Sequence, residues 1–181
     1  MSDLGRAAVV AGSVLALLGF FCVVFPAWTR QHIGKFPRCR IAAAALTAVD
    51  VLWSAWLLNQ TPLGPITPLK RWLIVLAPVS FVLVFVFMDE LLAARALGGF
   101  FLLAAAPLLD AARFHPSPLR YLVTLLAYGM AIKGMLLVLS PYLFRRTAER
   151  FLDTEPRVRR WGGACLAFAC LLVVLAATAY R

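Results

Sequence analysis

Charged side chains are scarce in this sequence. Only 14% of its 181 residues are charged, whereas 63% are hydrophobic. Soluble domains are close to one quarter charged and one half apolar, so the composition excludes an ordinary soluble domain. The apolar residues form blocks of about 20, enough for an α-helix to cross the hydrocarbon layer. The short alternating segments of a transmembrane β-barrel are missing. The sequence therefore predicts an all-α, polytopic membrane protein.

Catalytic motifs are missing as well. The only two histidines, His32 and His115, fall in separate loops on opposite sides of the predicted membrane, so they cannot form the bis-histidine pair of an intramembrane haem. No HExxH, GxSxG or Walker motif occurs. The cysteines form no CxxC pair and no disulfide framework; they are Cys22, Cys39, Cys165 and Cys170. We predict no enzymatic activity, no cofactor and no metal site.

The apolar blocks predict about six transmembrane helices in a single helical domain, residues 1–181. The predicted spans are Ala7–Trp28, Ile41–Asn59, Trp72–Met88, Glu90–Ala112, Leu119–Ser140 and Trp161–Tyr180. They divide into a first hairpin (residues 1–60), central helices (61–118) and a second hairpin (119–181). Only Met88-Asp89-Glu90 separates the third span from the fourth. One bent or re-entrant helix over Trp72–Ala112 is therefore the alternative.

Positive charge is concentrated between the apolar blocks. The chain carries 18 Lys and Arg against 8 Asp and Glu, a net charge of +10. Most of the Lys and Arg fall in the first, third and fifth loops, which the positive-inside rule makes cytoplasmic. Both termini are then expected outside. The expected partner of these charges is the anionic lipid headgroup rather than nucleic acid.

The two ends of the sequence share a pattern. Gly19 is followed after seven residues by Pro26, and Gly134 is followed after seven by Pro141. In each case the proline falls where a predicted span ends, and a basic segment and a new span follow. The pattern predicts a parallel internal repeat of a helical hairpin. The alternative is that any two hairpins in a basic, Ala- and Leu-rich protein look similar.

Two basic segments follow these prolines, Trp28–Arg40 and Tyr142–Arg160. Both mix aromatic residues with arginine, which favours a position in the headgroup layer. In the second segment one face of a short helix is formed by Leu143, Phe144, Thr147, Ala148 and Phe151. The predicted lipid-binding residues are Arg38, Arg40, Arg145, Arg146 and Arg150.

The C-terminal part, Tyr121–Tyr180, resembles the small two-helix inner-membrane proteins of bacteria called YjeT-like. The resemblance rests on Gly134, Pro141, Arg145-Arg146, Arg159-Arg160 and Gly162-Gly163. It covers about a third of the chain. It implies a helical hairpin in the bacterial inner membrane, and it implies no activity, because that family has none established.

Two charged residues interrupt the predicted spans, Asp50 in the second and Lys133 in the fifth. An isolated charge at this depth costs about 2.5–3.5 kcal/mol on insertion scales, which favours pairing. Asp50 is ten residues past Arg40, and Lys133 is eight before Pro141, so their expected depths agree. We predict a structural ion pair between them. Two alternatives stay open: Lys133 extends to the interface while Asp50 is protonated or locally bonded, or both line a proton or substrate path.

A polar group is expected on the outer side, formed by Asp110, Arg113 and His115. Asp110 and Arg113 are three residues apart and can pair on a helix. An acid, a cation and an imidazole together suit proton transfer or a phosphate-bearing lipid. The alternative is a helix terminus entering a proline turn.

These observations favour a structural or accessory role, such as a subunit or organiser of a membrane complex that contacts lipid through its basic segments. Partners would be anionic lipids, other membrane-protein subunits or further copies of the chain in a homo-oligomer. The alternative function is a small transporter or oligomeric channel that uses Asp50 and Lys133 in the membrane.

Overall fold

The computed structural model describes residues 2–60, 92–113, 115–151 and 154–180, with isolated positions between 72 and 83. Within this part the chain forms seven α-helices, one short 3-10 helix and no strand. Five of the helices are long and apolar enough to cross a membrane. The structure thus confirms the all-α class and indicates a multi-pass membrane protein. The predicted third span, Trp72–Met88, and its bent-helix alternative lie outside the described residues.

The helices follow one another as α1 (Asp3–Val24), α2 (Pro26–Lys35), η1 (Phe36–Arg38), α3 (Arg40–Gln60), α5 (Leu92–Arg113), α6 (Arg120–Leu139), α7 (Tyr142–Phe151) and α8 (Glu155–Thr178). The predicted first span was too long at its end. Pro26 opens a separate helix there, because proline is accepted at the first helical position but cannot continue α1 without a break.

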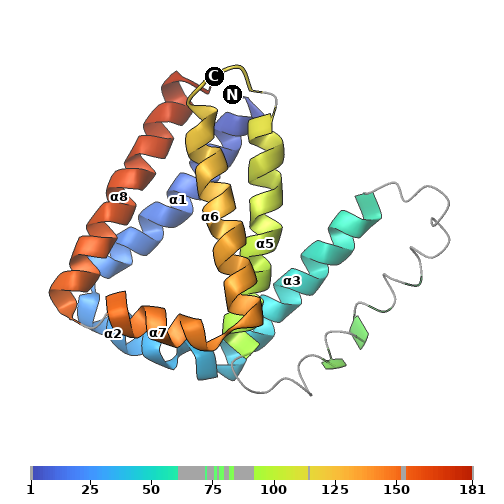
Figure 1. Cartoon of the computed structure of the whole chain (residues 1–181), viewed down its shortest axis with the longest axis vertical. Coiled ribbons are helices and arrows are strands. Elements are labelled where there is room, and N and C mark those ends of the chain that lie inside the picture. The colour runs from blue at the N-terminus through green and yellow to red at the C-terminus, as the bar shows by residue number, and fades with distance from the viewer. Residues whose placement is uncertain are drawn as a thin grey trace.

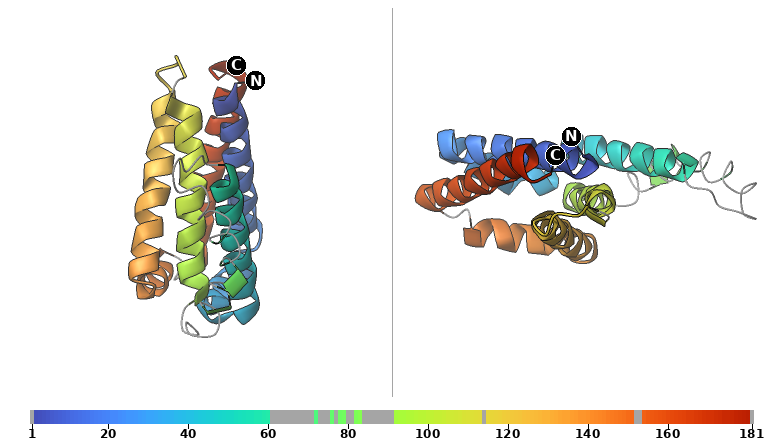
Figure 2. Two further views of the ribbon diagram at one scale, coloured as in Figure 1. Left: turned by 90° about the vertical axis from the view of Figure 1, so that its right-hand side faces the viewer. Right: turned by 90° about the horizontal axis from the view of Figure 1, so that it is seen from above.

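Helices α1, α5, α6 and α8 run between two ends of the molecule, and α3 leads outward from one of them (Figure 1). Both termini and the connection from α5 to α6 lie at one end. The short helices α2 and α7 lie across the opposite end, where α3, α5 and α8 begin (Figures 1 and 2). The structure therefore places the first and fifth loops of the sequence-based topology together, away from the termini; the third loop lies outside the described residues, and α5, which follows it, begins at the same end. Which of the two ends faces the cytoplasm stays a prediction.

Two antiparallel helix pairs form most of the packing, α1 with α8 and α5 with α6. Between them lies a core close to the end that holds the termini. Its buried members come from all four helices, together with one residue after α8, and include Leu4, Ala8, Ala105, Ala112, Val123, Ala127, Leu172 and Tyr180. Helix α3 packs on the other side of α5.

Small residues allow α1 and α8 to approach closely. A Cβ atom at Gly19 would lie 2.8 Å from the Gly162 carbonyl oxygen, and one at Gly12 would lie 3.3 Å from the Ala169 oxygen. Close backbone contact of this kind is how helices associate in lipid, where burial of apolar surface supplies no driving force.

Glycines also allow α5 and α6 to approach closely. A Cβ at Gly98 would lie 2.8 Å from the Gly134 oxygen, and a Cβ at Gly134 would lie 2.7 Å from the Gly98 oxygen. Ala105 on α5 and Ala127 on α6 are also buried. Each of these glycines thus marks a point where two backbones touch.

The two elbows before Pro26 and Pro141 have nearly the same geometry. Phe25 has φ −124° and ψ 60°, and Ser140 has φ −136° and ψ 73°. Each donates its backbone N–H to the residue four positions earlier, at 2.9 and 2.8 Å. Each elbow is followed by a ten-residue helix, α2 or α7.

The long helices after these elbows do not fold back on their predecessors. Helix α3 packs against α5 rather than α1, and α8 packs against α1 rather than α6. A ten-residue helix advances the chain by about 15 Å, more than the usual distance between packed helices. The first and second hairpins expected from the sequence are therefore not pairs of packed neighbours.

Candidate functional site

The basic segments meet at the end of the molecule where α2 and α7 lie across the bundle. The two short helices are in contact. The Phe36 ring, at the start of η1, lies 5.5 Å from the Phe144 ring of α7, centroid to centroid. We call the surface formed by α2, η1 and α7 the basic platform. It is assembled from segments more than a hundred residues apart in the sequence.

Helix α7 has one partly buried and one exposed face. Leu143, Phe144 and Ala148 are partly buried, as expected. Thr147 is exposed, and the side chain of Phe151 is outside the described residues. The arginines predicted to bind lipid, Arg145, Arg146 and Arg150, are all exposed. Arg145 Nε also forms an ion pair with Glu149 Oε1 at 2.7 Å.

Helix α2 is held to the end of α1 by a buried threonine. Thr29 Oγ1 donates to the Phe25 oxygen at 2.8 Å and approaches the Phe21 oxygen at 3.2 Å. Each of these carbonyls also accepts a backbone N–H, Phe21 from Phe25 and Phe25 from Thr29, both at 2.9 Å, so the hydroxyl adds a second donor where α1 meets α2. On the exposed side the Trp28 and His32 rings stack at 4.0 Å. Thr29 thus fixes the angle at which the platform leaves α1.

The remaining predicted lipid-binding residues belong to the link between α2 and α3. Arg40 is exposed at the first position of α3. The side chain of Arg38 lies outside the described residues. Arg40 and the α7 arginines therefore lie at the same end of the molecule, as expected.

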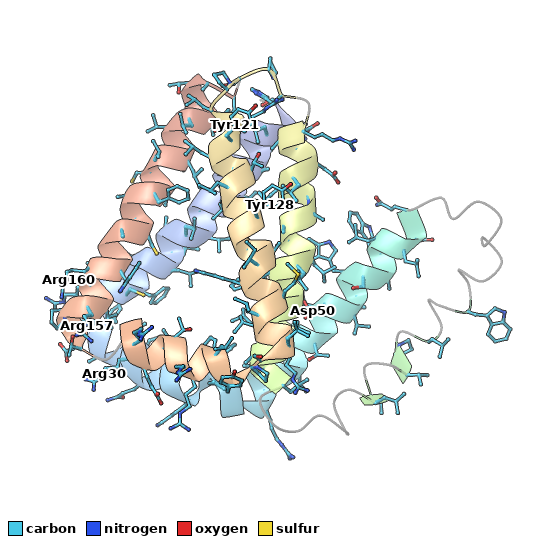
Figure 3. All side chains as sticks on the ribbon, viewed as in Figure 1. Arg30, Asp50, Tyr121, Tyr128, Arg157 and Arg160 are labelled. Atoms are coloured by element: carbon cyan, nitrogen blue, oxygen red, sulfur yellow. The ribbon has the colours of Figure 1, made fainter. Side chains whose placement is uncertain are left out.

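Asp50 lies where α3 passes α5 (Figure 3). A Cβ at Gly99 would be 2.9 Å from Asp50 Oδ2, so the glycine makes room for the carboxyl group. Asp50 Oδ1 and the nearby Thr47 Oγ1 are buried, and neither forms a hydrogen bond in the structure. The packing thus places two unpartnered oxygens in the contact between these helices.

Lys133 lies on a different helix, α6. It is exposed and lies next to the buried Gly134. Helix α5 packs against both α3 and α6 and separates them (Figure 2). No ion pair joins Asp50 and Lys133 in the structure. Their expected depths were matched, but an ion pair also requires α3 to lie beside α6, and α5 lies between these two helices. An exposed lysine on the lipid side can extend its amine toward the headgroups.

The outer polar residues are only partly brought together. His115 Nδ1 accepts the Ser117 N–H at 3.2 Å, and Arg120 donates to the carbonyl oxygens of His115 and Arg113 at 2.8 and 3.3 Å. Asp110 is exposed and forms no ion pair with a described residue. The expected pairing of Asp110 with Arg113 is therefore not seen. The arrangement is that of a helix terminus held by Arg120.

Tyr180 is a residue that the sequence analysis did not single out. It is fully buried, and its hydroxyl donates to the Leu119 oxygen at 2.6 Å. Its ring lies edge-on to His115, and its own carbonyl accepts a hydrogen bond from the Ser2 hydroxyl. Burial raises the pKa of this phenol. Tyr180 therefore joins the C-terminus, the N-terminus and the α5–α6 connection.

Within the described residues, no group of three or more His, Cys, Asp or Glu could hold a metal ion. No family model, curated protein or solved structure matches this chain. The resemblance of Tyr121–Tyr180 to the YjeT-like proteins thus stays a prediction.

Proposed function

We propose that the chain is a multi-pass protein of the bacterial inner membrane with a structural or accessory role, and that its basic platform contacts anionic lipid headgroups on the cytoplasmic side. The observation that carries this proposal is the contact between α2 and α7. It brings two basic segments from opposite ends of the sequence to one end of the bundle. A platform of this kind suits attachment to a charged layer, since each cation near an anionic membrane surface contributes about 1 kcal/mol.

The proposed topology has six spans with both termini outside. It is supported by the common location of the termini and by the clustering of α2, α7 and the start of α5 at the other end (Figure 1). Reporter fusions after Arg181 and within α7 test it. A reporter that is active outside at the C-terminus and inside at α7 is expected, and the opposite pattern would overturn the orientation.

Lipid binding is tested by changing the three exposed arginines of α7, Arg145, Arg146 and Arg150, to glutamine. The variant should retain less anionic lipid during purification in mild detergent, because each lost charge weakens the binding free energy by about 1 kcal/mol. Arg6→Gln is the matched control, because Arg6 is also exposed and ion-paired along its helix, with Asp3 at 2.8 Å, but lies at the other end. Unchanged lipid in the α7 variant, or an equal loss in the control, would contradict the proposal.

A transporter or channel is the second candidate. It is favoured by the buried, unpartnered Asp50 Oδ1 and Thr47 Oγ1 between α3 and α5. Because α5 lies between α3 and α6, the proposed path runs along Asp50 and Thr47 and does not include Lys133. In a variant whose four native cysteines are changed to serine, Asp50→Cys should react with a charged, membrane-impermeant thiol reagent if the site opens to water; the replacement is needed because the native cysteines are free and Cys39 and Cys170 are exposed. A lack of reaction supports the accessory role.

A further inference from the structure

The corner where α2 meets the beginning of α8 gathers three arginines outside the residues already assigned to lipid. The contact of Gly19 with Gly162 fixes how far α8 extends beyond the end of α1. The residues of α8 just before Gly162 therefore reach the level of α2, and the two helices are in contact. Val158 of α8 and Thr29 of α2 are buried in this region, at 0% and 6% exposure.

Burial of Val158 and Thr29 leaves their basic neighbours facing outward. Arg157 and Arg160 are exposed on α8, and Arg30 is exposed on α2. Figure 3 shows the three side chains at the same corner of the molecule. Arg160 Nε lies 3.4 Å from the Pro156 oxygen, so its side chain runs back along α8 toward Arg157. Three guanidinium groups from two helices thus share one surface.

An aromatic residue completes this corner. Trp161 is exposed, and with Arg157 and Arg160 it occupies positions i, i+3 and i+4 of α8, which lie on one helix face. An exposed tryptophan at the end of a transmembrane helix sits at headgroup level. Among the residues that the structure describes, the acidic residue nearest in sequence to the two α8 arginines is Glu155, which is exposed in the first turn of α8. Within the described part of the chain, the corner remains positive when this carboxylate is included.

We propose that Arg30, Arg157 and Arg160 form a site for a lipid whose headgroup carries two phosphates, such as diphosphatidylglycerol. The inference rests on the proposed function, because it requires this end of the bundle to lie in the headgroup layer. Guanidinium groups bind phosphate oxygens in a bidentate manner. Arginines on two helices can hold two linked phosphates at once, whereas a lipid with one phosphate engages only part of the set. Trp161 packs beside the glycerol and upper acyl region.

The test uses the full chain in mild detergent and native mass spectrometry with added lipid. The probes are diphosphatidylglycerol, phosphatidylglycerol and phosphatidylcholine. The unmodified protein should bind the first most tightly. Changing Arg30, Arg157 and Arg160 singly to glutamine should weaken this binding about tenfold each, because each change removes a charge-assisted hydrogen bond to a phosphate. The triple variant should lose the preference for two phosphates.

Arg159→Gln is the matched control. Arg159 is exposed in the same turn of α8 but lies on the other side of Val158, so its loss should change the affinity for diphosphatidylglycerol less than twofold. An equal loss in this control would show a diffuse basic surface and overturn the site. Equal affinity for one-phosphate and two-phosphate lipids would also overturn it.

The outcome can be separated from that of the platform. If the α7 variant loses bulk anionic lipid while the corner variants keep their two-phosphate preference, the corner proposal fails and the platform stands. If neither set changes lipid binding, both proposals fail.

Discussion

The two antiparallel helix pairs, α1 with α8 and α5 with α6, both pack through small residues, but only one pair is joined by a short connection. In the first, Gly5, Gly12 and Gly19 face the backbone of α8 at heptad spacing. In the second, Gly98 and Gly134 touch, with alanines continuing the contact at the same spacing. The α5–α6 pair is joined by a short connection, whereas the α1–α8 pair consists of the two ends of the chain. Close helix packing here depends on small residues rather than on proximity in the sequence.

The two pairs differ in what keeps their helices together. Helices α5 and α6 are held at a high effective concentration by residues 114–119. Helices α1 and α8 have no such connection at the end that holds the termini. Their contact there is made by Tyr180 and Ser2, and Gly5 makes room, since a Cβ at that position would lie 2.7 Å from the Tyr180 oxygen. We therefore expect the α1–α8 pair to be the more sensitive to substitution.

The largest effect is expected for Gly19→Leu. The new side chain would meet backbone atoms of α8, the Gly162 oxygen at 2.8 Å and the Leu166 nitrogen at 3.1 Å. Backbone cannot move aside without separating the helices, so the free energy of unfolding should fall by about 3 kcal/mol. Thermal unfolding in detergent measures this.

Gly163→Leu is the matched control for that change. Gly163 is next to the contact glycine of α8, but nothing lies within 4 Å of a Cβ built there. The same substitution should leave the melting temperature unchanged or raise it, since leucine favours a helix more than glycine does. Equal destabilisation by both variants would show that the α1–α8 contact is not formed as described.

The equivalent change in the other pair, Gly98→Leu, should cost less, about 2 kcal/mol. A Cβ at Gly98 meets the Gly134 oxygen at 2.8 Å, but the covalent connection keeps α5 beside α6. Gly129→Leu on α6 is its control, since a Cβ there meets nothing within 4 Å. A larger loss for Gly98→Leu than for Gly19→Leu, in the same unfolding assay, would reverse the ranking of the two pairs.

A smaller effect is expected for Tyr180→Phe, which keeps the buried ring and removes only the hydroxyl that bonds to Leu119. Loss of one buried hydrogen bond should reduce the free energy of unfolding by about 1 kcal/mol. Tyr121→Phe is the control because Tyr121 is 62% exposed. If the two variants unfold alike, Tyr180 does not hold the termini to the α5–α6 connection.

Much of the fold follows from local sequence. Apolar length gives the long helices, and Pro26 and Pro141 give the elbows, because proline acts through its own ring and missing N–H. Local sequence did not predict which helices pack against each other. The glycines of α1 were visible, but nothing local states that they face Gly162 and Ala169 rather than α3. The Asp50–Lys133 pair was inferred from depth alone, and depth does not determine which helices are neighbours.

The smallest effect is expected where sequence and structure disagree most, in the coupling between Asp50 and Lys133. Because α5 separates their helices, Asp50→Asn and Lys133→Met should act independently. Asp50→Asn should stabilise the protein or leave it unchanged, since it removes the charge of a carboxyl group that has one buried oxygen without a hydrogen bond. Lys133→Met, at an exposed site, should change little. The double variant should equal the sum of the two within about 0.5 kcal/mol. A coupling well above that value in a thermal double-mutant cycle would mean that the residues meet in the membrane, and that the arrangement of α3, α5 and α6 differs from the one described.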